Sequence, residues 1–434
     1  MKVIQLLLYI LIVTAQDPSE EFDDDDLNDS QMIESEDTLR LLQVLYRHGD
    51  RSPTRAYTKD IYEESDWPQG YGQLSTEGMQ QELELGEFLM REYVDTGFLS
   101  SEYSQSEVYV RSTSYERALM SAYSVLSGLF PPGQNDSVWN HNLNWKPIPV
   151  HTVPLEEDYL LRMNLSCPVY NTARNNDPQR KLFMQQIMDE FSEFYSYVSK
   201  YTGESNTWDG IHAVIDPIFC QYASHYNLPE WITDDILDQF LQLYDLYSIE
   251  HSYPREYAYL KGGFLVGEML EHMINKSKHE ISTPQKLFMY SAHDTTIVMF
   301  LTTLGIFNDR KPKYTACVLV ELHEVQPGQF AVQISYRNES DSMPYVLKLP
   351  NCDELCPLEK FAQIMQPSIP KDLKKACGIK GSAGVDVYAT STIIVIVELC
   401  LLVLLVIAVA ILCWVKRDKL ANTHDYMPVP LEMS

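Results

Sequence analysis

Two patterns of apolar and polar positions occur along the chain, and they predict different elements. Leu39 to Tyr46 is a nearly continuous apolar run, and Glu107 to Val110 and Leu287 to Tyr290 are shorter runs of the same kind. Such runs between turn residues are typical of buried strands. Helical spacing follows the first two runs, at Met79, Leu83, Gly86, Met90 and Tyr93 after a capping Thr76, and at Ala118, Leu119, Ala122, Leu126 and Leu129 before a stop at Pro131-Pro132-Gly133.

The same alternation continues after the third run. A helix is expected from Thr295 to near Gly305, and Thr315 to Leu322 with Phe330 to Tyr336 predicts a hairpin across Gln326-Pro327-Gly328. Strands that alternate with helices predict an α/β core, here a doubly wound mixed sheet with helices on both faces. We place this core at about 38–150 and 251–380.

The segment at about 155–250 has a different pattern. It offers no convincing strand, and its apolar residues follow helical spacing at Leu182, Phe183, Ile187, Phe191, Phe194 and Val198, and again at Ile236, Phe240, Leu243 and Leu246. An all-helical stretch inside an α/β chain suggests an inserted cap over a site.

Both ends of the chain predict a membrane protein. Residues 1–15 have the charge, apolar run and small-residue ending of a secretory signal peptide. After the body at 38–380 and a linker at 381–391, residues 392–415 are apolar over a length that spans a bilayer, with Glu398 near the luminal end. Lys416, Arg417 and Lys419 follow, which predicts a cytoplasmic tail at 416–434 and a single-pass type I topology with a luminal or extracellular body. In this tail Tyr426 and Val429 form a tyrosine-based string that sorting adaptors could bind.

Charge narrows the choice of partners. The formal net charge is −28, and residues 16–37 hold eleven acidic side chains and no basic one, so they predict a disordered arm. The remaining 28 − 11 = 17 negative charges exclude nucleic acid as a natural partner. An anionic substrate would need a local cationic pocket that acts against this global field.

Such a pocket is predicted where the strand-like runs end. The heptad Arg47-His48-Gly49-Asp50-Arg51-Ser52-Pro53 follows the first run, Arg111 ends the second, and His293-Asp294 follows the third. Ligands of open α/β sheets bind beyond the carboxyl ends of the strands, so these groups should meet at one edge. Arginine forks suit phosphate oxygens, and a neutral histidine is a nucleophile.

The heptad also resembles the signature of the histidine acid phosphatases. Four further stretches are similar to the lysosomal and prostatic members, including their type I membrane forms: Trp67-Pro68-Gln69-Gly70, the segment from Tyr109 to Thr113, the segment from Pro147 to Pro154, and the segment from Met289 to Thr295. The resemblance covers nearly the whole body. It implies the histidine phosphatase fold, an acid phosphatase that acts on small phosphomonoesters, no metal or cofactor, and a possible homodimer.

The resemblance also implies roles for individual residues. His48 would attack phosphorus and carry the phosphoryl group, and Asp294 would protonate the leaving alcohol. The non-bridging oxygens would be held by Arg47, Arg51, Arg111 and His293. One departure is Ser114, where the family usually has aspartate; it puts in question how Arg111 or a neighbour such as Arg117 is held.

The cysteines and sequons agree with an oxidising compartment. Eight cysteines include Cys400 and Cys413 in the apolar stretch, and the other six allow 15 pairings. Cys352 and Cys356 are close enough to pair locally. The resemblance adds Cys167 with Cys377 and Cys220 with Cys317. Glycosylation is expected at Asn135, Asn164, Asn275 and Asn338.

Two alternatives stay open at this point. The body could be a catalytically silent receptor or adhesion module on the same fold, although the intact set of site residues argues against it. It could also be a specialised inositol-phosphate or phosphoanhydride hydrolase, which the depth of the pocket would decide. Zinc hydrolysis is disfavoured, because neither His279-Glu280 nor His323-Glu324 has a second histidine four residues after the first. The lysosome and the cell surface are both compatible with the chain.

Overall fold

A computed structural model of the chain describes residues 38–132, 140, 142–143, 145–278, 284–339, 342–379 and 387–422. Its centre is a mixed sheet in the order β2-β3-β1-β4-β5-β6, with β7 paired to β5. The strands are β1 (Leu39–Arg47), β2 (Val108–Ser112), β3 (Leu287–Ala292), β4 (Cys317–Gln326), β5 (Gln329–Arg337), β6 (Tyr345–Val346) and β7 (Cys356–Pro357). The pairs β1–β3 and β2–β3 are parallel, and β4 runs antiparallel to both β1 and β5. The expected doubly wound mixed sheet is confirmed.

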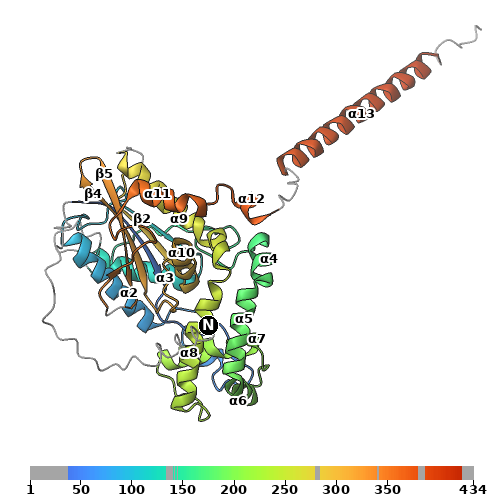
Figure 1. The fold of residues 1–434 in the computed structure, drawn as a ribbon. Helices are drawn as coiled ribbons and strands as arrows, with labels where there is room; N and C mark the ends of the chain where they lie inside the picture. The colour runs from blue at the N-terminus through green and yellow to red at the C-terminus, as the bar shows by residue number, and fades with distance from the viewer. Residues whose placement is uncertain are drawn as a thin grey trace, which may run out of the picture. The chain divides into compact units, whose positions relative to one another are not determined.

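Alternating residues of β1 pack on opposite faces of the sheet, which is why this central strand is apolar throughout. Leu41 and Leu45 belong to one core cluster, and Leu42, Val44 and Tyr46 belong to the other. Helices α9 (Tyr259–Ser277), α10 (Asp294–Leu304) and α11 (Leu358–Met365) cover the first face, and α2 (Thr76–Leu89) and α3 (Glu116–Leu129) cover the second (Figure 1). Both faces of the sheet are therefore shielded from water.

The buried face of α2 differs from the predicted one. Met79 is exposed, and the side chains that point inward are those of Glu82, Leu85 and Leu89. The helix also continues as a π-helical turn, η2 (Met90–Val94), which shifts the phase of the last turn. The apolar spacing in the sequence therefore identified the helix and the buried positions Gly86 and Tyr93, whereas Leu83 and Met90 are only half-buried. The expected cap was also wrong, because Ser75 is the N-cap and Thr76 is the first helical residue.

The chain between β2 and β3 contains a separate group of helices. They are α4 (Pro168–Asn176), α5 (Pro178–Glu190), α6 (Ser192–Thr202), α7 (Trp208–Ala223) and α8 (Asp234–His251). The aromatic and aliphatic side chains of α5 to α8 form a core cluster of their own. The first amphipathic helix expected here is divided at Phe191, and Leu182 is exposed rather than buried. No strand occurs in the described residues of this segment, as the sequence predicted.

The hairpin of β4 and β5 turns at Pro327-Gly328, where Gly328 has a φ of 74°. The left-handed conformation favours glycine, so the turn signal in the sequence is explained. Helix α10 ends similarly at Gly305, whose φ is also 74°. Both predicted boundaries are confirmed.

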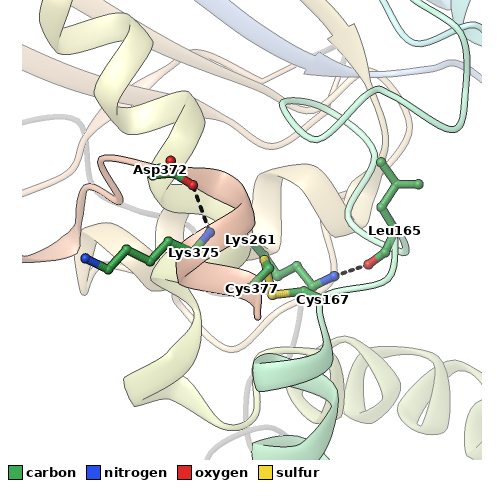
Figure 2. The surroundings of a disulfide bond; sticks show 6 residues. All are labelled: Leu165, Cys167, Lys261, Asp372, Lys375 and Cys377. Carbon is green, nitrogen blue, oxygen red and sulfur yellow. Dashed lines mark hydrogen bonds between the residues drawn. A yellow bond between two sulfur atoms is a disulfide. The ribbon is translucent and has the colours of Figure 1, made fainter. Parts of the chain in front are cut away.

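Ser166–Thr172 and Lys371–Ser434 form a second compact unit. The disulfide between Cys167 and Cys377 lies within it, and Asp372 caps the short helix α12 (Leu373–Cys377) by accepting from the Lys375 amide (Figure 2). Helix α13 (Val387–Asn422) contains one candidate membrane span, Val395–Arg417. Its apolar length fits a single transmembrane helix.

Two of the three expected disulfides are present, Cys167–Cys377 and Cys352–Cys356. The expected pair Cys220–Cys317 is wrong, because both thiols are free and buried. Cys317 packs in the core between the sheet, α2 and α3, whereas the Cys220 thiol on α7 lies 3.6 Å from an Arg51 nitrogen. Burial raises the pKa of both thiols to about 12, so both are protonated.

Several sequence predictions lie outside the described residues. They are the signal peptide, the acidic arm, Asn135, Tyr426, Val429 and most of the linker at 381–391. Among the other sequons Asn164 is exposed, and Asn275 and Asn338 are half-buried. Glycosylation at these positions stays a prediction.

Candidate active site

The heptad leaves the carboxyl end of β1 and turns directly against α2. A Cβ on Gly49 would lie 2.4 Å from the carbonyl oxygen of Gly78, so only glycine fits this crossing. The buried carboxylate of Asp50 accepts from the Ser75 hydroxyl at 2.5 Å, and Ser52 donates to the Gly70 carbonyl at 2.5 Å. These bonds hold the turn in one conformation, so His48 is presented on a rigid support.

His48 is held as a neutral imidazole with a defined tautomer. Its Nδ1 lies 2.9 Å from the carbonyl oxygen of Gly49, which can only accept, so Nδ1 carries the proton and Nε2 keeps its lone pair. Burial lowers the pKa of His48 well below its ordinary value, and Arg117, Arg47 and Arg51 act in the same direction. The unprotonated Nε2 can therefore act as a nucleophile, and the surrounding guanidinium groups can bind an anionic substrate beside it.

His293 and Asp294 follow the adjacent strand β3. The His293 ring centroid lies 5.4 Å from that of His48, and its Nε2 is 3.0 Å from the Thr113 hydroxyl. Burial, followed by the charge of Arg117, lowers the pKa of His293 to about 3. A helix that begins at Thr295 would have Asp294 as its N-cap, but the N-cap residue of α10 is His293. Asp294 is the first helical residue, and its Oδ1 accepts from the Thr295 amide at 2.7 Å.

Arg47, the residue before His48, is almost fully buried, with 1% of its surface exposed. It donates to the Pro312 carbonyl at 2.7 Å and to the Tyr244 hydroxyl at 3.3 Å, and one nitrogen lies 3.6 Å from the Asp294 carboxylate. Its guanidinium also stacks 4.3 Å from the ring centroid of Tyr314. Its Nε has no hydrogen-bond partner in the described structure, so this arginine retains an unused donor.

Arg51 is held by the helical segment. Asp216 of α7 receives two bonds from it, at 2.7 and 3.4 Å, in the bidentate arrangement that suits a planar guanidinium. Although burial opposes ionisation, the charge of Arg51 lowers the pKa of Asp216 to about 2. Nothing in the sequence around Asp216 indicated this role, because it lies inside α7, directly before Pro217 and far from the predicted strand ends.

Arg111 does not join the site as the sequence analysis expected. Its guanidinium donates at 2.8 Å to the fully buried carboxylate of Asp158, and its backbone pairs with His151. Residues of a strand alternate between faces, and Arg111 shares with Tyr109 the face opposite to the one where Val110 packs. The position that meets the catalytic groups belongs to a different residue.

That residue is Arg117, in the first turn of α3. Its charge lowers the pKa of His48 and of His293. Burial and the neighbouring Arg51 lower the pKa of Arg117 itself to about 10, although the charge of Asp294 acts in the opposite direction. Its guanidinium stacks 4.7 Å from the ring centroid of Tyr115 and bonds to the Gly72 carbonyl at 3.4 Å. An arginine at the start of the helix after β2 satisfies the edge rule better than one inside the strand.

Lys311 completes the positive surroundings and was also missed. Its ammonium lies 3.2 Å from the Asp294 carboxylate and 3.5 Å from the ring centroid of Tyr244. Although burial acts in the opposite direction, Lys311 and Arg47 hold the pKa of Asp294 well below its ordinary value. The basic run Arg310-Lys311-Pro312-Lys313 before β4, in so acidic a chain, was a signal for this group.

The site contains a buried nucleophile candidate, three guanidinium groups and an adjacent carboxylate. A family model described as "Histidine phosphatase superfamily (branch 2)" matches residues 38–345. This chain belongs to the histidine phosphatase superfamily.

Members of this superfamily with curated names align over most of the chain. Lysosomal acid phosphatase of Rattus norvegicus is 39% identical over 382 residues, which cover 86% of this chain and 87% of the rat protein. Prostatic acid phosphatase of Homo sapiens is 40% identical over 347 residues, 78% of this chain and 88% of the human protein. A phytase from Hafnia alvei in complex with tartrate shares the fold, with a TM-score of 0.60 and 16% identity over 78% of this chain and 98% of the phytase.

Proposed function

We propose that this chain is an acid phosphatase that hydrolyses phosphate monoesters through a covalent phosphohistidine on His48. The arrangement of His48 carries this conclusion, because its Nδ1–H is fixed on Gly49 and its Nε2 lone pair is left among cations. Relatives named acid phosphatases, aligned over most of the chain, support the same activity. A catalytically silent module would not need this neutral histidine.

In this mechanism the phosphoryl group is clamped before it reacts. Arg47, Arg51 and Arg117 would donate to its non-bridging oxygens, and charge that spreads over these oxygens in the transition state would be stabilised by fixed donors. If the Thr113 hydroxyl donates to Nε2 of His293, the Nδ1–H of His293 is left to donate to the same group.

Asp294 would transfer a proton to the leaving alcohol. Nε2 of His48 attacks phosphorus, the phosphorus–oxygen bond to the alcohol breaks, and the leaving oxygen takes its proton from the Asp294 carboxyl. Lys311 and Arg47 keep this carboxyl ionised in the empty site, so its proton must arrive with the substrate. A phosphate ester below pH about 6 carries one proton of its own and can supply it.

The second step reverses the role of the carboxylate. Water attacks the phosphohistidine, Asp294 accepts the proton of that water, and inorganic phosphate leaves as the Nε2 lone pair is restored. Two barriers replace one larger barrier, which is the advantage of a covalent intermediate.

We also propose that Val395–Arg417 anchors the body in a lysosomal or cell-surface membrane, with type I topology. The basic residues directly after this apolar stretch support a cytoplasmic tail, where Tyr426 and Val429 would bind a sorting adaptor. Homodimerisation stays a prediction from the family.

The direct test of the activity uses the full chain in detergent micelles. It should hydrolyse p-nitrophenyl phosphate. For an alkyl ester such as glycerol 2-phosphate, whose leaving oxygen needs the proton, kcat/KM should rise as the pH falls through about 6, where the ester gains its proton. His48→Ala should lose turnover and retain its folded structure by circular dichroism. A folded His48→Ala variant with near wild-type turnover would contradict the proposed mechanism.

A further inference from the structure

A cavity beside the catalytic groups has no role in the chemistry described above. It measures about 280 Å³ and lies between the loop after β1, helices α7 and α8, and the loop before β4. Arg51 and Lys311 line it, so it opens directly beside the position of the phosphoryl group. A cavity of this size has room for part of the substrate other than the phosphate.

Lys311 fixes which part of the substrate enters. Asp294 must point at the bridging oxygen to protonate it, and the Lys311 ammonium lies 3.2 Å from that carboxylate. Lys311 would therefore stand beside the leaving group. With 16% of its side chain exposed, it is accessible to a ligand in the cavity.

The charges around Lys311 change during the proposed reaction. Before substrate binds, the Asp294 carboxylate balances the ammonium. When Asp294 takes up the proton that it later donates, the one carboxylate that the described residues place within ion-pair distance of the ammonium is lost. The face of the Tyr244 ring, 3.5 Å from the ammonium, and the charges of Asp216 and Asp245, neither of which forms an ion pair with Lys311 in the described structure, offer weaker compensation. Of the other charged groups that line the cavity, Asp216 is bound bidentately to Arg51, and Arg55 is exposed and forms no ion pair with any described residue. Burial and the charge of Lys311 lower the pKa of His212, which disfavours a positive charge on this ring.

We propose that Lys311 is a specificity-determining residue that selects phosphomonoesters whose leaving group carries a second anionic group near the ester oxygen. The inference rests on the proposed function and names the substrate class of the same site. A carboxylate or second phosphate there would neutralise the ammonium in the protonation state that reacts. Arg55, at the exposed side of the cavity, would extend the same preference outward.

The competing explanation is that Lys311 only positions Asp294. The two explanations differ in one measurable quantity, the ratio of kcat/KM between two esters that differ in a single charge. A positioning role changes both values of kcat/KM together and leaves the ratio unchanged. A specificity role changes the ratio.

Glycerol 2-phosphate and 2-phosphoglycerate form such a pair, because a hydroxymethyl group in the first replaces a carboxylate in the second. The full chain would be assayed at about pH 5.5, above the usual pKa of a carboxyl group. We expect the wild type to prefer 2-phosphoglycerate, and Lys311→Met to lower this preference on the order of tenfold. Lys311→Arg should retain it.

Lys313→Met is the matched control. Lys313 lies two residues away, is exposed and pairs with Glu339 at 2.6 Å. Its substitution therefore removes the same charge from the same loop, but outside the cavity. Its ratio should equal that of the wild type. If Lys311→Met does not accumulate as folded protein, Lys311→Gln answers the same question.

Failure of the inference and failure of the function can be told apart. If the wild type hydrolyses p-nitrophenyl phosphate but Lys311→Met leaves the ratio unchanged, the specificity role is wrong and the activity stands. If the wild type hydrolyses none of the three esters, the proposed function fails, and this inference fails with it.

Discussion

At His48, burial and three neighbouring guanidinium groups all act on the protonation equilibrium of the imidazole. All lower its pKa, so its folded-state pKa lies below that of the unfolded chain. The unfolded chain then binds the extra proton, and as the pH falls below about 6.5 the folded state loses stability rather than gaining it. A bound phosphate neutralises the same guanidinium groups, so substrate should remove part of this cost. The residue is thus kept nucleophilic at acidic pH at the expense of stability in the empty site.

The placement of Arg117 gives the first prediction. Arg117→Ala should lower kcat/KM for p-nitrophenyl phosphate on the order of 10²–10³-fold, because it removes a fixed donor to transition-state charge. Arg111→Ala is the comparison. It leaves the buried Asp158 carboxylate unpaired, so it should lower the denaturation midpoint and leave the kinetics of the remaining folded enzyme nearly unchanged. If Arg111→Ala lost activity and Arg117→Ala lost only stability, Arg111 would be the phosphate-binding residue after all.

Asp294 gives the second prediction. Asparagine preserves its size but cannot give a proton, so the loss should depend on the leaving group. Alkyl phosphates should lose on the order of 10²–10⁴-fold in the rate of phosphorylation, and p-nitrophenyl phosphate, whose phenolate leaves unaided, should lose much less. Single-turnover phosphorylation of Asp294→Asn with both substrates at one pH measures this. Equal losses would show that Asp294 only positions the site.

At the scale of elements, the sheet edge and the helical segment each position part of the site. Strands β1 and β3 position His48, His293 and Asp294, whereas α7 and α8 hold Arg51 and Arg47 in place. Asp216 and Tyr244 come from the helices and contact Arg51 and Arg47 respectively. The helical segment therefore orients the phosphate clamp in addition to lining the cavity.

The third prediction concerns this orientation. Asp216→Asn keeps the shape of the side chain but removes the charge that holds Arg51, so Arg51 should lose its fixed direction. We expect KM for p-nitrophenyl phosphate to rise about tenfold, with kcat reduced less. Inhibition by inorganic phosphate should weaken in parallel. A variant with unchanged KM and unchanged phosphate inhibition would mean that Asp216 is not needed to orient Arg51.

The sequence predicted the elements better than the contacts between them. Three apolar runs and their turn residues were sufficient to place His48, His293 and Asp294 at one edge, because parallel strands present their carboxyl ends together. Arg111 was misplaced since strand alternation turns it toward the other face. Asp216 and Lys311 could not be paired with their partners, because these contacts join segments 165 and 17 residues apart and depend on how the helices pack.

At the scale of the whole molecule, a strongly acidic chain contains a strongly cationic site. With a net charge of −28, the protein does not attract phosphate esters at long range, and the arginines act only at contact distance. The excess of carboxylates is tolerated because the site cations are buried and rigidly held. Rigidity then has to come from the fold itself.

The fourth prediction is that the two disulfides contribute unequally to the free energy of unfolding. Cys167 and Cys377 are 210 residues apart, and Cys352 and Cys356 only 4. Loop entropy predicts a loss of about 5 kcal/mol for the double serine variant of the long bridge and about 2 kcal/mol for the short one. Urea unfolding of both double variants, with Cys220→Ser as the free-thiol control, measures this difference. Equal losses would contradict the entropic account.

The central claim is that His48 carries the phosphoryl group. The most direct measurement mixes full-length protein with ³²P-labelled p-nitrophenyl phosphate, quenches in base within one turnover, and maps the label by proteolysis and mass spectrometry. We expect one label, stable in base and labile in acid, on the peptide that contains His48. His48→Ala should lose this label, and His151→Ala, which changes an exposed histidine stacked on the Tyr109 ring, should retain it. Turnover without a labelled histidine, or a label on another residue, would contradict the account.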